Sequence, residues 1–152
     1  MRIARRFLVA FIVVFVSAVC CLVIFVPNTS RIALNQSSAF QRMQDLNLAE
    51  HNYAAQHRDA GFACNLGDLG KQGLVDGLLA SGTRSGYHFD IQCPQNGSQL
   101  ATSYMVIAVP VEPGRTGKYA FCTDQSGEIW YGENGLTADC LARHKPLEQK
   151  YR

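Results

Sequence analysis

Beyond the adjacent Cys20 and Cys21 of the first apolar run, the sequence contains no close pair of cysteines, and this absence is the first constraint on its chemistry. Four of its six cysteines follow residue 60, and they stand 29, 29 and 18 positions apart: Cys64, Cys93, Cys122 and Cys140. Zinc sites usually place two cysteines about two to four residues apart, so we expect no metal site. The G-x-S-x-G turn of α/β-hydrolases is also missing. We therefore expect no catalytic, cofactor-binding or metal-ligating residue, no bound cofactor and no enzyme activity.

Acidic residues are absent from the first 44 positions, and dense clusters of basic residues are absent throughout. All 12 acidic residues lie after residue 26, against 11 basic ones once Arg2, Arg5 and Arg6 are set aside from the 14. Proteins that bind nucleic acids present a clustered basic stripe to the phosphates. The scattered charges of this chain predict no nucleic-acid partner.

A long apolar run occupies residues 7–26 and ends at Pro27. As a helix, a run of this length spans roughly 30 Å, the thickness of the hydrocarbon core of a bilayer. A cleaved signal peptide has a shorter core of about 7–15 residues followed by a small-x-small cleavage site, and no convincing site of this kind follows. The run predicts an uncleaved transmembrane helix, and the arginines before it predict a cytoplasmic N-terminus.

These features divide the chain into four parts: a basic cytoplasmic flank at 1–6, a transmembrane helix at 7–26, a linker at 27–38 and an exported domain at 39–152. In an oxidising compartment, the four cysteines of the exported domain predict two disulfides, for which three connectivities exist. We favour Cys122–Cys140, which would pin the C-terminal tail, with Cys64–Cys93 as the remaining pair.

The exported domain opens with the pattern of an amphipathic helix. Residues 39–58 contain no glycine or proline, and Ser37 and Ser38 offer capping hydroxyls before them. Apolar side chains recur at steps of three and four: Phe40, Met43, Leu46, Ala49 and Tyr53. Glu50 is placed with the polar residues of the other face. The pattern predicts a helix that packs one face on the downstream domain.

A glycine-rich connector at 62–86 follows, in which 73–80 could hold one or two helical turns. Four strand candidates come next, at 86–93, 103–111, 118–123 and 128–131. Short, turn-rich connections at 112–117 and 124–127 predict an antiparallel meander. Trp130 and Tyr131 are expected to complete the core, with an exposed aromatic contact as the alternative. The predicted fold class is α+β: an N-terminal transmembrane helix, an amphipathic helix packed on a three- or four-stranded antiparallel sheet, and a disulfide-pinned C-terminal tail.

Several separated segments resemble those of type IV pilins and of the pseudopilins of type II secretion. They are 47–53 at the helix end, 61–62 and 66–69 in the connector, 81–89 at the start of the sheet and 121–129 in its closing hairpin. The resemblance covers roughly residues 40–135 and implies a pilin-like globular domain. The start departs from the family, because Arg6 replaces the glycine before the cleavage point and Phe11 replaces the glutamate of the mature helix. The chain therefore lacks the prepilin cleavage motif.

The resemblance implies a non-enzymatic, membrane-anchored protein with a structural or interaction role in a type IV pilus or a type II secretion-type assembly. Its partners would be the membrane, crossed once, and proteins of that assembly. The implied location is the bacterial inner membrane, with the C-terminal domain in the periplasm. The alternative is a single-pass binding module displayed outside any filament, and an anchored hydrolase is a third hypothesis.

Overall fold

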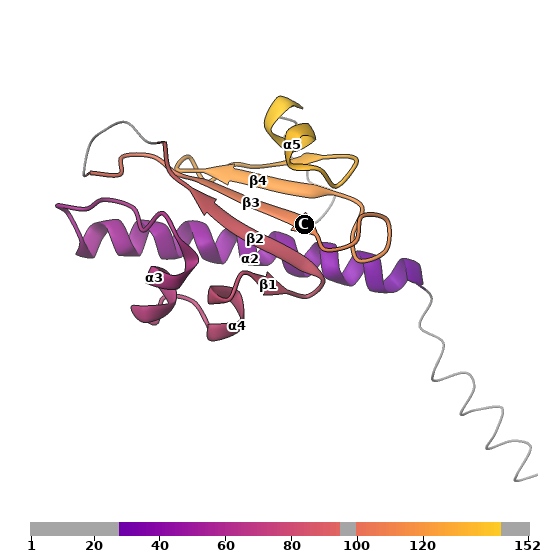
Figure 1. Ribbon diagram of the computed structural model, residues 1–152, viewed down its shortest axis with the longest axis horizontal. Helices are drawn as coiled ribbons and strands as arrows, with labels where there is room; N and C mark the ends of the chain where they lie inside the picture. The colour runs from indigo at the N-terminus through magenta and orange to yellow at the C-terminus, as the bar shows by residue number, and fades with distance from the viewer. Residues whose placement is uncertain (1–27, 95–99, 144–152) are drawn as a thin grey trace, which may run out of the picture. The chain divides into compact units, whose positions relative to one another are not determined.

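The computed structural model describes residues 28–94 and 100–143. The elements in chain order are helices α2 (Asn28–Gln56), α3 (Leu66–Lys71) and α4 (Gly77–Ala80), strands β1 (Thr83–Arg84), β2 (Tyr87–Gln92), β3 (Met105–Pro110), β4 (Ala120–Asp124) and β5 (Ile129–Gly132), and helix α5 (Thr137–Arg143). The chain divides into two units, 1–31 and 32–152, and the arrangement below is that of the second. Figure 1 shows its helices and strands.

Helix α2 starts earlier than the sequence pattern predicts. It runs Asn28–Gln56, so residues 28–38, expected to form a linker, are helical. The two serines expected to cap the helix, Ser37 and Ser38, lie inside it. No glycine or proline interrupts residues 28–56, and tertiary contacts stabilise a helix whose sequence alone is a weak helix former.

Two polar side chains in this early part of α2 bind the loop between β3 and β4. Asn35 Nδ2 donates to the carbonyl of Thr116 (2.8 Å), and the amide of Lys118 donates to Gln36 Oε1 (2.8 Å). Gln36 is buried by this contact. Both bonds join residues that are far apart in the sequence, so the apolar periodicity of the helix could not have indicated them.

The sheet has five strands in the order β1-β2-β3-β4-β5, and every neighbouring pair is antiparallel. The predicted meander is therefore confirmed, and its four strand candidates correspond to β2, β3, β4 and β5. The two-residue strand β1 was not among the predicted strands. It pairs with β2 after a turn at Ser85 and Gly86, both of which have positive φ.

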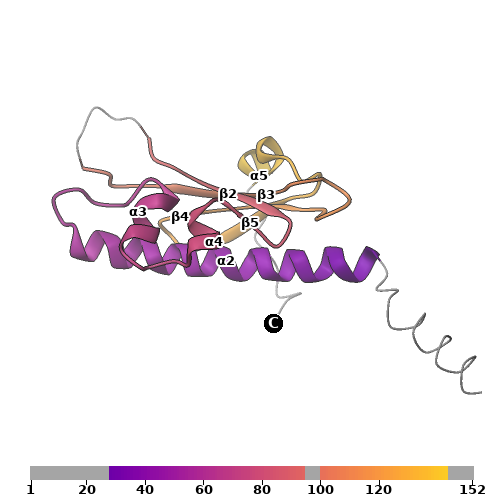
Figure 2. The same cartoon turned by 60° about the horizontal axis from the view of Figure 1, so that its bottom comes forward.

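The main core lies between α2 and the inner face of the sheet. Strand β2 alternates buried and exposed residues along its length, and Tyr87, Phe89 and Ile91 face α2. The buried apolar residues of α2 are Ala39, Met43, Leu46 and Ala49. Removing these side chains from water is the main favourable contribution to folding. Figure 2 shows α2 on one side of the sheet and α5 on the other.

The connector contributes two short helices at the β1 edge of the sheet, and each begins at a capping side chain. Asn65 Oδ1 accepts from the amide of Asp68 at the start of α3, and Asp76 Oδ1 accepts from the amide of Leu79 at the start of α4. Leu69 and Leu79 join the core from these helices. Helix α4 confirms the helical turn expected within 73–80, whereas α3 is additional.

The outer face of the sheet carries a second cluster under α5. Its buried members are Ile107, Ala120, Cys122, Trp130 and Cys140. Trp130 is thus part of a core, as expected. The tail shows no periodicity in the sequence, yet residues 137–143 form α5. Both favoured disulfides are present, Cys64–Cys93 and Cys122–Cys140, with Cα separations of 5.4 and 6.0 Å.

The predicted fold class needs correction. The α+β character and the disulfide-pinned tail are present, but the sheet has five strands rather than three or four. No helix within residues 28–94 and 100–143 has the length and apolar character needed to cross a membrane. The transmembrane helix predicted at 7–26 lies outside the described residues, so it is not part of the fold as the structure gives it.

Candidate functional site

Glu50 is the most unusual side chain of the domain because it is an acid with no exposed surface. Its relative exposure is 0 %, and the polar face to which the sequence analysis assigns it is the wrong one. Positions three, four and seven residues apart share a face of a helix. Glu50 follows Leu46 by four residues and Met43 by seven, so it belongs to the buried stripe. This spacing is the feature of the sequence that indicates a buried Glu50.

One oxygen of Glu50 binds the turn after α2, and the other has no hydrogen-bond partner among the described residues. The amide of Ala63 donates to Glu50 Oε2 at 2.8 Å, and Glu50 Oε1 is buried and unpaired. Burial raises the pKa of Glu50 from 4.5 to about 7, and the hydrogen bond from Ala63 offsets part of this rise. The carboxyl therefore changes its charge near neutral pH.

A chain of neutral hydrogen bonds lies on the same side of α2. The hydroxyl of Tyr104 donates to Asn47 Oδ1 (3.0 Å), and Asn47 Nδ2 donates to Thr123 Oγ1 (2.8 Å). All three side chains are buried. Burial raises the pKa of Tyr104, and the negative charges of Glu50 and Asp124 raise it further. The hydroxyl therefore stays protonated and continues to donate to Asn47.

Replacing Asn47 by alanine should lower the free energy of unfolding by about 2–3 kcal/mol, because it leaves the buried polar groups of Tyr104 and Thr123 without this partner. Urea unfolding followed by circular dichroism would measure the change. Asn52→Ala is the matched control, since Asn52 is exposed on the same helix. Its effect should stay within about 0.5 kcal/mol. Equal losses in the two variants would contradict the structural role of Asn47.

The turn after α2 is attached to the segment before β3. The amide of Phe62 donates to the carbonyl of Ala101 (3.0 Å), and the amide of Ala101 donates to the carbonyl of Ala60 (2.9 Å). Gly61 permits this approach, because it has φ of +79° and a Cβ there would lie 2.1 Å from the Ala101 oxygen. The Cys64–Cys93 disulfide attaches the end of the same turn to the segment after β2.

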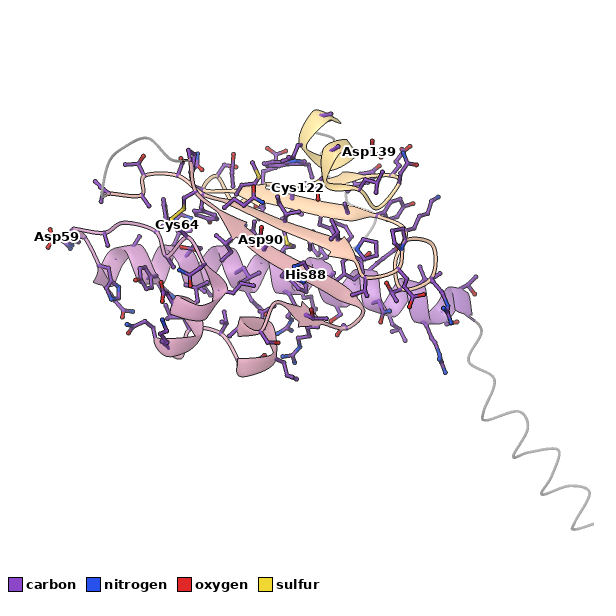
Figure 3. All side chains as sticks on the ribbon, in the orientation of Figure 1. Asp59, Cys64, His88, Asp90, Cys122 and Asp139 are labelled. Atoms are coloured by element: carbon purple, nitrogen blue, oxygen red, sulfur yellow. A yellow bond between two sulfur atoms is a disulfide. The ribbon has the colours of Figure 1, made fainter. Side chains whose placement is uncertain are left out.

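The four predicted site residues therefore form two separate disulfides at different places in the domain. Figure 3 labels Cys64 and Cys122, one from each bridge, and the two labels lie well apart on the ribbon. The first bridge is half-buried beside the turn after α2, whereas both cysteines of the second have 0 % exposure.

A hollow of about 230 Å³ lies between α2 and the connector. Its lining residues are Arg42, Asp45, Leu48, Ala49, Asn52, Leu74, Val75, Asp76 and Leu79. Arg42 pairs with Asp45 (2.8 Å), and Asp76 pairs with Arg84. Leu48 is 63 % exposed at the hollow, and Leu78 on α4 is 65 % exposed. The hollow therefore combines paired charges with an exposed leucine.

The described residues contain no group of three or more His, Cys, Asp and Glu side chains placed to hold a metal ion. Compared with models of known protein families, with curated proteins and with solved structures, the chain has no significant match.

Proposed function

We propose that this chain is a non-enzymatic pilin-like protein whose domain contacts other proteins in a type IV pilus or a type II secretion-type assembly. The observation that carries the proposal is the architecture. A helix of 29 residues packs along an antiparallel meander, and a disulfide attaches the C-terminal tail to the sheet. This is the layout that the resemblance of the separated segments implies.

The exposed leucines of the helical side support a role in protein contacts. Leu34 and Leu48 on α2 are 67 % and 63 % exposed. They are separated by about four helical turns and so lie on the same side of the helix. Leu78 of α4 is exposed to a similar degree. Exposed leucines on one side of a helix are available for contact with another protein.

The proposed location is the periplasm, at the inner membrane of a bacterium. Two disulfides in one small domain support an oxidising compartment, because disulfides are rare in the reducing cytosol. Both bridges attach a segment to the sheet region. Membrane attachment is the part of this proposal that fractionation of the full chain would test directly.

The deciding experiment is site-specific photo-crosslinking in living cells. A photoreactive residue at Leu48 should crosslink to structural proteins of the pilus or secretion assembly. The same residue at Val111, which is 52 % exposed in the loop after β3, is the matched control and should give much weaker crosslinks. Equal crosslinking at the two positions, or crosslinks only to proteins outside such an assembly, would contradict the proposal.

The second candidate is a membrane-displayed binding module outside any filament. The hollow beside Leu48 favours it, because a recess of about 230 Å³ can accept a side chain or a very small ligand. The same experiment separates the two candidates. A binding module would crosslink at Leu48 to one partner in cells that lack the assembly genes, whereas a pilin-like subunit would lose its crosslinks in those cells.

A further inference from the structure

The two disulfides differ in how far an external thiol can reach them. Cys64 and Cys93 are both half-buried, and the residue that follows each of them in the chain is exposed. Cys122 and Cys140 have no exposed surface. A disulfide is reduced when a thiolate attacks one of its sulfur atoms, so the reaction depends on access to that sulfur. The Cys64–Cys93 bridge is therefore the more open of the two to attack.

The segments that the Cys64–Cys93 bridge joins have further attachments that do not depend on it. Two backbone hydrogen bonds join the turn before Cys64 to Ala101, and the amide of Ala63 donates to Glu50 Oε2. On the other side, β2 pairs with β3 up to the residue before Cys93. Cleaving the bridge therefore leaves both cysteines in place in a domain that remains folded.

The Cys122–Cys140 bridge has the opposite surroundings. Both of its cysteines belong to the buried cluster under α5, together with Ile107, Ala120 and Trp130. An external thiol can reach these sulfur atoms only when the packing between α5 and the sheet opens. Such local opening costs free energy, so reduction of this bridge in the folded domain is slow.

The backbone at Cys64 further favours opening of the first bridge. Cys64 has a φ of +59°, a left-handed conformation that a residue with a side chain adopts at a cost. Cleaving the disulfide removes one of the constraints that hold Cys64 in this conformation. Exposed and strained disulfides are in general the ones that are reduced most easily.

We propose that Cys64–Cys93 is a redox site of the folded domain, which a dithiol reductant opens reversibly while Cys122–Cys140 stays closed. One thiolate of the reductant attacks a sulfur of the bridge, forms a mixed disulfide with that cysteine and releases the other cysteine as a thiolate. The second thiol of the reductant then displaces the first cysteine. The reductant loses two electrons and two protons and becomes a disulfide, and the two cysteines gain them as thiols. This reaction does not require that the domain belong to an assembly.

Timed reduction of the full chain by dithiothreitol, followed by alkylation and peptide mass spectrometry, tests this site. Thiols at Cys64 and Cys93 should appear roughly tenfold faster, or more, than thiols at Cys122 and Cys140, because the buried bridge must wait for local opening. The peptides report each cysteine separately, so the two cysteines of the first apolar run do not interfere.

Two further signals show whether the domain stays folded while the first bridge opens. Circular dichroism should stay constant, and so should the fluorescence of Trp130, which is the only tryptophan and lies in the cluster under α5. Addition of oxidised glutathione after removal of dithiothreitol should close Cys64–Cys93 again.

The double variant Cys64→Ala and Cys93→Ala is the matched control. It should keep its circular dichroism and lose the fast phase, and its remaining bridge should open at the slow rate. In urea that unfolds the unaltered chain, both bridges are exposed and should open at similar rates. Equal rates in the folded chain, faster opening of Cys122–Cys140, loss of circular dichroism together with the first bridge, or failure of that bridge to close again would each overturn the proposal.

Discussion

Glu50→Gln is expected to raise the free energy of unfolding at pH 8 by about 3 kcal/mol. The unfolded chain releases the Glu50 proton near pH 4.5, whereas the folded domain retains it until about pH 7. Between these values the folded state binds more protons, so its stability falls as the pH rises. The contribution of neutral Glu50 is complete below pH 4.5 and has been lost above pH 7. Glutamine has the same shape and does not ionise, so it avoids the loss.

Urea unfolding at pH 4.5, 6 and 8 would measure this effect. The two proteins should be similarly stable at pH 4.5 and should diverge as the pH rises. Glu128→Gln is the control, because Glu128 is exposed in the turn before β5 and its replacement should change stability by less than about 0.5 kcal/mol. A stability of the unaltered chain that increases from pH 5 to pH 7 relative to Glu50→Gln would refute the assignment.

Replacing both Cys122 and Cys140 with alanine, which removes their disulfide, is expected to lower the free energy of unfolding by about 3–5 kcal/mol. The bridge closes a loop of 18 residues and so restricts the unfolded chain. It also fills the cluster under α5, where both cysteines are fully buried beside Trp130. The loss therefore combines the restored freedom of the unfolded chain with a cavity in the folded state.

The double replacement of Cys64 and Cys93 is the matched comparison. Its loop of 29 residues is longer, which alone predicts a slightly larger loss, but both cysteines are only half-buried. We expect the free energy of unfolding to fall less for this pair, because replacing two half-buried cysteines leaves only a small cavity. Thermal unfolding of the two variants under non-reducing conditions would decide the order. A larger loss for Cys64–Cys93 would mean that loop closure outweighs packing in this domain.

The sheet could be predicted from the sequence because its patterns are local. Alternating apolar residues mark β2, a continuous apolar run marks β3, and turn residues separate the later strands. The first part of α2 could not be predicted, because its polar residues Asn35 and Gln36 are held by a loop distant in the chain. Helix α5 has no periodic pattern and is held on the sheet through Cys140.

The buried polar cluster was missed for a different reason. Glu50 was expected on the polar face because it is an acid, although its spacing from Leu46 places it on the apolar stripe. The partners of the cluster are also distant, because Asn47 and Thr123 are separated by 76 positions. A single sequence without an alignment gives no sign of such a pair. Both disulfides could be predicted because pairing Cys140 with Cys122 holds the tail on the sheet. Of the four cysteines after residue 60, only Cys64 and Cys93 then remain to pair with each other.

The order of contacts along the chain has a consequence for synthesis. Every strand of the sheet pairs with the next one in sequence, and such near-neighbour contacts form quickly. Helix α2 is made before all of them, but its side-chain hydrogen bonds to the sheet side join residues 47 to 82 positions away. During synthesis, the apolar stripe of α2 is therefore exposed until the strands of the sheet that cover it have left the ribosome. Until the sheet is complete, this stripe is the surface that most needs protection from aggregation.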